Sequence, residues 1–124
     1  MQHLGKLVVA EFYLCDTALL DDVGFIETIM LEAAEKAGAR IISHSFHRFS
    51  PQGVSGAVII MESHLAIHTW PEYGYAAVDL FTCGDTVSAD NAFHHLRDAL
   101  GAERVSTKEV HRGEVGMLQR VKPA

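Results

Sequence analysis

The stretch VSGAVIIMESHLAIHTW occupies residues 54–70 and contains two runs of strand length. Apolar, β-branched and aromatic residues dominate both runs, at 54–62 and 65–70, which predicts two strands. Pro51, Gln52 and Gly53 form a turn signal before the first run, and residues 40–49 predict another strand before that turn. Short connections join antiparallel neighbours, so we expect a sheet built mostly by hairpins.

The rest of the chain predicts three more strands and two helices. The strands are expected at residues 6–14, 75–83 and 103–112. From about Thr17 the apolar residues recur every three or four positions up to a stop signal at Gly38, which predicts an amphipathic helix. A second helix is expected between the cap Ser88 and Gly101, and the tail after Gly113 is expected to be loose. Two helices on one face of a mostly antiparallel sheet make a two-layer α+β sandwich.

Composition limits the class of protein. The chain has 124 residues, 48% of them hydrophobic, and a formal net charge of -6. This length predicts a single domain over residues 1–124, and a chain this short gains from pairing with a second copy. The acidic balance argues against a nucleic-acid partner and favours a small-molecule substrate. The chain has no apolar run of about 18 residues and no signal peptide, so we expect no membrane segment and a cytoplasmic location.

Polar residues interrupt the apolar strands most densely between residues 46 and 84. Taken singly, Glu62 could mark the exit of a strand into solvent, His68 could be a hydrogen-bonded strand histidine, and Cys83 could be a small buried residue. His64 and His68 are four residues apart, which suggests a metal site. In an extended strand that spacing spans about 13 Å, so the two imidazoles could not share one ion and we expect no metal.

Six short motifs fall in this region: FHRF at 46–49, GVSG at 53–56, ESHL at 62–65, IHTWPE at 67–72, GYA at 74–76 and FTCG at 81–84. In this order and spacing they resemble the S-adenosylmethionine decarboxylase proenzyme family, in its short prokaryotic pyruvoyl-dependent form. The resemblance covers roughly residues 4–113.

This resemblance implies self-cleavage between Glu62 and Ser63, in which the Ser63 hydroxyl attacks the preceding carbonyl and β-elimination leaves a pyruvoyl cofactor. Ser55 and His68 match the residues that assist this processing. Hydroxyl and imidazole groups suit the stabilisation of an oxyanion and the removal of a proton. The pyruvoyl carbonyl would form a Schiff base with the substrate and act as an electron sink. Cys83 matches the residue that returns a proton to the product.

The implied substrate is S-adenosylmethionine, whose decarboxylation gives CO2 and the aminopropyl donor for spermidine biosynthesis. Phe49 and Trp70 are the candidates for stacking on the adenine, and Glu72 is the candidate for binding the ribose hydroxyls. The implied assembly is a homodimer of processed, two-chain protomers, with the bare sheet faces packed together and active sites near the interface.

One departure from the family keeps other functions open. The family usually has Gly-x-His near its N-terminus, whereas this chain has Gly5, Lys6 and Leu7. If the missing imidazole touches the substrate, the chain could instead be a pyruvoyl-dependent arginine or ornithine decarboxylase. An alternative of another class is an unprocessed regulatory binding module that pairs with an active relative.

Overall fold

A computed structural model describes residues 2–61 and 63–121, which contain six strands, three α-helices and two short 3-10 helices. In chain order the elements are β1 (His3–Tyr13), α1 (Thr17–Leu20), α2 (Val23–Lys36), β2 (Ile41–Arg48), β3 (Val54–Ile60), β4 (Ser63–Trp70), η1 (Pro71–Tyr73), β5 (Tyr75–Thr82), α3 (Ala89–Leu100), β6 (Arg104–Glu114) and η2 (Val115–Met117).

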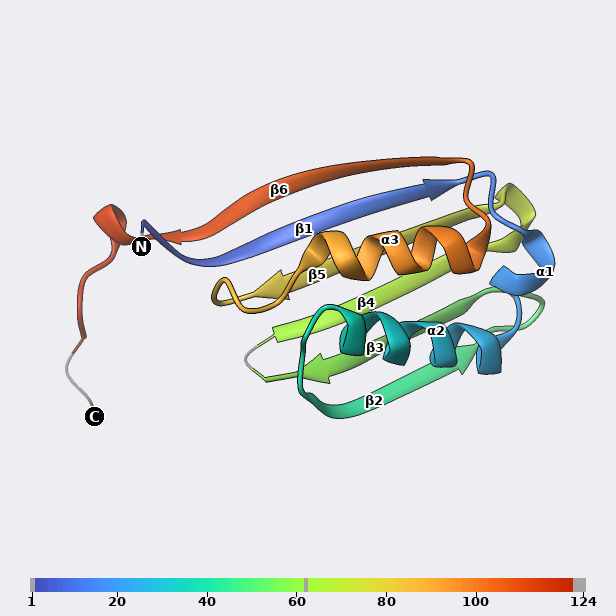
Figure 1. Cartoon of the computed structure of the whole chain (residues 1–124), viewed down its shortest axis with the longest axis horizontal. Helices are drawn as coiled ribbons and strands as arrows, with labels where there is room; N and C mark the ends of the chain where they lie inside the picture. The colour runs from blue at the N-terminus through green and yellow to red at the C-terminus, as the bar shows by residue number, and fades with distance from the viewer. Residues whose placement is uncertain (1, 62, 122–124) are drawn as a thin grey trace.

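The six strands form one sheet in the order β2-β3-β4-β5-β1-β6. Each strand is antiparallel to its neighbours, and hairpins join β2 to β3, β3 to β4 and β4 to β5, whereas β1 pairs with β5 and β6 without a hairpin to either. The helices α2 and α3 lie side by side across one face of this sheet (Figure 1). The predicted two-layer α+β sandwich is therefore confirmed, with a sheet that is wholly antiparallel.

The core lies between the helices and the sheet because alternate strand residues point toward the helices. Leu65 and Ile67 of β4 and Leu80 of β5 are at most 1% exposed. They meet a helical layer that includes the fully buried Met30 and Leu96. Apolar burial of this kind is the main term that stabilises a small domain.

The other strand residues form what we call the open face, on the side of the sheet away from α2 and α3. Its apolar members are small or only partly covered: Leu7, Val9, Ala57, Ile59, Ala66, Ala77 and Phe81. They are spread over β3, β4, β5 and β1, and the ion pair between His64 and Asp79 lies among them. Partly covered apolar residues on several strands of a small protein leave this face suited to contact with another molecule.

The first predicted helix is wrong in one respect, because it is two helices. Asp16 accepts hydrogen bonds from the amides of Ala18 and Leu19 and caps α1, and Asp22 caps α2 through the amide of Phe25. Aspartate favours the N-cap because its side chain competes for amides that lack a partner in the first turn. The second aspartate therefore starts a new helix.

Several strand ends also differ from the expectation, among them the start of β1 at His3, three residues earlier than predicted. β4 begins at Ser63, two residues earlier than predicted, and pairs there with Ile60 of β3. The chain after Gly113 is not a loose tail over its first residues, since β6 continues to Glu114 and η2 follows. The amide of Val115 donates to the carbonyl of Gln2, which ties η2 to the start of β1.

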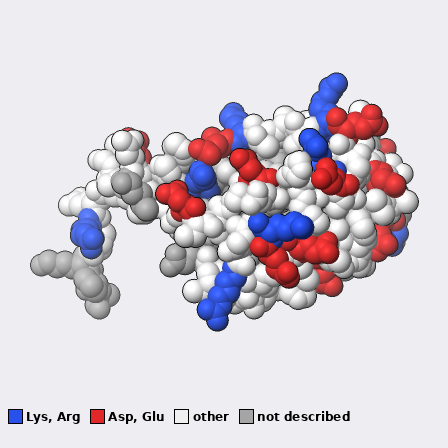
Figure 2. Space-filling view, in the orientation of Figure 1, with Lys and Arg blue, Asp and Glu red and all other residues white. Residues whose placement is uncertain are grey.

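The charged residues on the helical side agree with the acidic composition. Figure 2 shows this side with Asp and Glu side chains gathered in several groups and Lys and Arg side chains scattered between them. On the face shown, Lys and Arg side chains do not gather into the basic stripe that is typical of nucleic-acid binding.

Candidate active site

Ser55 of β3 and His68 of β4 are directly opposite each other in the sheet and lie on the open face. The Ser55 Oγ atom is 2.8 Å from the His68 Nδ1 atom. At this distance the hydroxyl and the imidazole share a hydrogen bond, and imidazole can exchange protons near neutral pH. The two predicted processing residues therefore form one hydrogen-bonded pair.

A cavity of about 270 Å³ adjoins this pair. The pair lines it together with the three predicted substrate-binding residues, Phe49, Trp70 and Glu72, and with Gln52, Gly53 and Thr69. Phe49 is 47% exposed and Trp70 is 40% exposed, so both aromatic faces are available to a ligand. The structure thus brings five of the predicted site residues around one cavity.

Local chain geometry fixes Glu72 at the rim of this cavity. β4 ends at Trp70, and Pro71 at the first position of η1 starts a single tight turn. Gly74 closes that turn with a φ of 61°, a conformation that favours glycine. Its carbonyl accepts a hydrogen bond of 2.9 Å from the amide of Cys15. The turn that carries Glu72 is therefore anchored to the end of β1.

Ser63 lies at the opposite end of the sheet from this cavity. It is the half-buried first residue of β4, five positions before His68. At 3.2–3.4 Å per residue the Cα atoms of these two residues are about 17 Å apart, and the odd spacing places their side chains on opposite faces. One copy of the chain therefore does not bring Ser63 to His68. Glu62, on the other side of the expected cleavage site, lies outside the described residues.

Cys83 is at the same end as Ser63. It follows β5 directly, and Phe81 of β5 is opposite His64, the neighbour of Ser63. The exposed Cys83 lines a second cavity, of about 300 Å³, near the start of β1 and the end of β6. In this cavity the hydrogen bond with His111 and the charge of Lys6 hold the pKa of Glu109 below its usual range.

Several polar residues of the open face escaped the sequence analysis. The Tyr75 hydroxyl donates a hydrogen bond to the Glu11 carboxylate, and burial together with this bond raises the Tyr75 pKa. Tyr75 also stacks on Trp70 and Tyr13, at centroid distances of 5.3 Å and 5.5 Å. Tyr75 therefore supports one face of the Trp70 ring. The signal was Glu11 itself, a carboxylate within the apolar run KLVVAEFYL.

Other titratable groups have simpler explanations. The Cys15 thiol is buried, which raises its pKa to about 11, and it lies 3.6 Å from the carbonyl oxygen of Phe12. A thiol in such surroundings stays protonated and inert, so we interpret Cys15 as a structural residue. Within residues 2–61 and 63–121, no group of three or more His, Cys, Asp or Glu side chains is placed to hold a metal ion.

Comparison with known proteins identifies the family. The model of a family described as S-adenosylmethionine decarboxylase matches residues 6–113. This chain belongs to the S-adenosylmethionine decarboxylase family. A relative from Acidithiobacillus ferrooxidans, named S-adenosylmethionine decarboxylase proenzyme, is 56% identical over 130 residues, which cover 100% of this chain and 98% of the relative. A Thermotoga petrophila protein of the same name is 57% identical over 120 residues, covering 94% and 92%.

A solved structure supports the same grouping. The crystal structure of an adenosylmethionine decarboxylase from Aquifex aeolicus superposes with a TM-score of 0.85 at 32% identity. The match covers 98% of this chain and 100% of the other. The family and enzyme class predicted from the motifs are thus confirmed, and neither an amino-acid decarboxylase nor a regulatory module is favoured. The described residues of this S-adenosylmethionine decarboxylase family member contain no helix that is both long and apolar enough to span a membrane.

Proposed function

We propose that this chain is a self-processing, pyruvoyl-dependent decarboxylase that converts S-adenosylmethionine to its decarboxylated form and CO2. The observation that carries the proposal is the cavity in which Phe49, Trp70 and Glu72 surround the Ser55–His68 pair. Aromatic faces, a carboxylate and a proton-transfer pair together match the chemistry of a cationic nucleoside substrate. The family to which the chain belongs supports the same reading.

Each part of the substrate has a matching group in the cavity. Adenine stacks favourably on aromatic rings, and Phe49 and Trp70 both expose theirs. The two ribose hydroxyls can donate to the carboxylate of Glu72, which accepts only. The sulfonium cation is attracted to the negative faces of the same aromatic rings.

Processing uses groups of the chain itself. The Ser63 Oγ atom attacks the carbonyl carbon of residue 62, the peptide C–N bond breaks, and an ester joins the two parts. Removal of the Ser63 α-proton then breaks the Cβ–Oγ bond and releases the first part as a carboxylate. Water finally displaces ammonia and leaves the pyruvoyl group. His68 is the proposed acceptor of the α-proton, and Ser55 is its hydrogen-bonded partner.

The position of Ser63 in the chain suits the formation of a pyruvoyl group. As the first residue of β4 it follows the β3–β4 connection directly, so cleavage before it leaves the pairing of the later β4 residues intact. When formed, the group supplies an electron sink for the breaking carbon–carbon bond. Cys83, at the same end of the sheet, is the proposed donor of the proton that replaces CO2. A working thiol requires reducing conditions, which supports our proposal of a cytoplasmic location.

The distance of about 17 Å between Ser63 and His68 along one strand leads us to propose a homodimer with shared sites. If two open faces pack about a twofold axis that crosses the strands, each β4 runs antiparallel to its counterpart. The Ser55–His68 end of one copy then approaches the Ser63 end of the other. The small side chains of Ala66 and Ala77 at the centre of the open face favour close packing of two sheets.

Intact mass spectrometry of the purified protein tests the processing, with Ser63→Ala as the uncleaved control. Cleavage before Ser63 predicts two chains of 62 residues from the 124-residue precursor, with the later chain lighter by one ammonia than a chain that begins with serine. CO2 release from carboxyl-labelled S-adenosylmethionine, arginine and ornithine then tests the substrate. A single full-length mass that persists on long incubation would refute the processing, and release from an amino acid alone would refute the substrate.

A further inference from the structure

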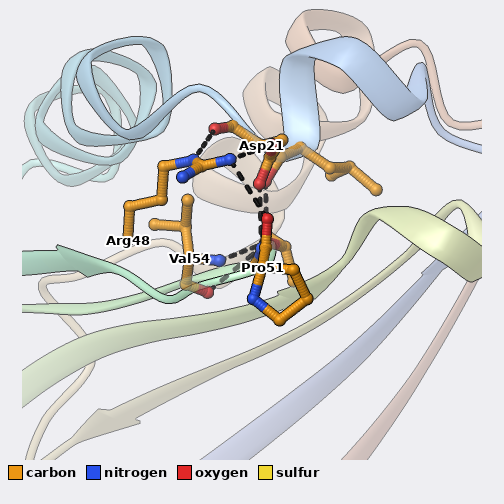
Figure 3. A network of polar contacts seen from close by, with 7 residues as sticks. Asp21, Arg48, Pro51 and Val54 are labelled. Carbon is orange, nitrogen blue, oxygen red and sulfur yellow. Dashed lines mark hydrogen bonds and ion pairs between the residues drawn. The ribbon is translucent and has the colours of Figure 1, made fainter.

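Asp21, at the end of α1, connects this helix to the loop between β2 and β3. Its Oδ2 atom accepts a hydrogen bond of 2.7 Å from Arg48 Nη2, and its Oδ1 atom accepts one of 2.8 Å from the amide of Gly53. Arg48 Nε also donates to the Asp21 carbonyl oxygen at 3.2 Å, and Nη2 approaches the Pro51 carbonyl at 3.4 Å. Figure 3 shows the Arg48 guanidinium directed toward Asp21 and the carbonyl of Pro51, with dashed lines for these contacts.

The loop held in this way carries one wall of the cavity. Phe49 is its first residue, and the Phe49 amide donates a hydrogen bond of 2.8 Å to the carbonyl of Gly53. Gly53 therefore donates its amide hydrogen to Asp21 and accepts from Phe49 at its carbonyl oxygen, so it links the two residues. Gly53 is also packed tightly against β4, since an added Cβ atom would lie 3.1 Å from the Thr69 carbonyl oxygen.

The opposite wall of the cavity is tied to the same helix. The Thr69 hydroxyl, in a residue only 6% exposed, donates a hydrogen bond of 2.7 Å to the carbonyl of Leu20, the residue before Asp21. It also accepts one of 2.9 Å from the amide of Val54. Thr69 directly precedes Trp70, so the two aromatic walls, Phe49 and Trp70, are connected by hydrogen bonds to the last residue of α1 and to the residue that follows it.

An ion pair as exposed as Asp21–Arg48 adds little to stability, which leaves its geometry to be explained. We infer that Asp21 is a positioning residue for substrate binding: through Gly53 it sets where Phe49 stands relative to Trp70. Asp21 itself does not line the cavity. The inference rests on the proposed function, because it assumes that the nucleoside binds between these two rings.

The test compares Asp21→Asn with Asp22→Asn. Both variants remove one carboxylate charge from the same turn, but Asp22 only caps α2 through the Phe25 amide, a role that asparagine retains. At position 21 asparagine has a single acceptor oxygen, so it can accept from Gly53 or from Arg48 but not from both. Binding is measured in the Ser63→Ala background, where no turnover occurs, by titrating S-adenosylmethionine against the fluorescence of Trp70, the only tryptophan. Processing and steady-state kinetics are measured with Ser63 intact.

We expect Asp21→Asn to raise the Kd and the KM about tenfold, since small misplacements of binding groups are costly, while kcat stays within about twofold and cleavage reaches completion. Asp22→Asn should leave the Kd and the KM within about twofold of the parent values. Equal constants for the two variants would overturn the inference. If Asp21→Asn does not fold, Asp21→Glu replaces it, because the extra methylene group moves the carboxylate away from its position between the Gly53 amide and Arg48. An unchanged Kd in that variant overturns the inference equally. No binding by the parent Ser63→Ala chain would overturn the proposed function as well.

Discussion

Ser63→Ala and His68→Ala should each abolish self-cleavage when made alone, whereas dimers that contain one chain of each kind should recover it. The reason is the separation of about 17 Å between the two positions in one copy, against the roughly 3 Å that proton transfer requires. A mixed dimer joins the intact Ser63 of the His68→Ala chain to the intact His68 of the other chain. One of its two sites is then complete.

The expected yield follows from the symmetry of the dimer. Equal amounts of two freely mixing chains give mixed dimers as about half of all dimers, so about half of the His68→Ala chains should be cleaved and no Ser63→Ala chain should be. The chains are co-expressed with different tags, isolated through both tags in turn, and weighed by intact mass spectrometry. Among doubly tagged dimers the cleaved share of His68→Ala chains should approach completion.

A second mixture supplies the control. Ser55→Ala and His68→Ala both damage the same hydrogen-bonded pair, so each site of their mixed dimer lacks one member of the pair and cleavage should stay low. Recovery in this control would mean that the pair is not contributed as a unit by one copy. Doubly tagged Ser63→Ala and His68→Ala dimers that remain uncleaved would refute the shared site.

Two further predictions concern the sheet and are measured by urea unfolding in the Ser63→Ala background, which keeps one chain. Gly56→Ala should lower the free energy of unfolding by about 1–3 kcal/mol through overpacking, because the new Cβ atom would lie 2.0 Å from the Phe46 Cδ1 atom. Gly116→Ala is the control, because its new Cβ atom would meet nothing within 4 Å. Equal losses of stability in the two variants would contradict the packing argument. Tyr75→Phe should remove a hydrogen bond to Glu11 and cost about 1 kcal/mol at neutral pH. Folding raises the Tyr75 pKa above its ordinary value of 10.0. The difference in free energy of unfolding between the parent and Tyr75→Phe should therefore be constant below about pH 10 and shrink above it. A difference that grows above about pH 10 would be inconsistent with the raised pKa.

Much of the fold could be predicted because the apolar pattern is strongly periodic. The alternation of buried and exposed residues in β4 and β5 and the three-to-four spacing in α2 and α3 each follow from local geometry. The break between α1 and α2 was missed because two capping aspartates, Asp16 and Asp22, compete with a continuous apolar spacing. Only the hydrogen bonds that each cap makes show where one helix ends and the next begins.

The site was predicted unevenly for a physical reason. Phe49, Ser55, His68, Trp70 and Glu72 lie close together because β3 and β4 are adjacent and antiparallel, and their motifs could be recognised from sequence order alone. The support behind them could not be predicted. Asp21 contacts Gly53 across 32 residues of chain, and no local pattern encodes a partner at that distance.

The sequence by itself determined the chemistry: which residues can attack, transfer protons, stack and accept hydrogen bonds, and which strands and helices carry them. Only the tertiary structure decided how these groups are distributed. It placed Ser63 and Cys83 at one end of the sheet and the Ser55–His68 pair at the other. The reason is that position along a strand fixes distance and side-chain direction at once, so two residues in neighbouring motifs can be kept about 17 Å apart by the rigidity of the strand that joins them.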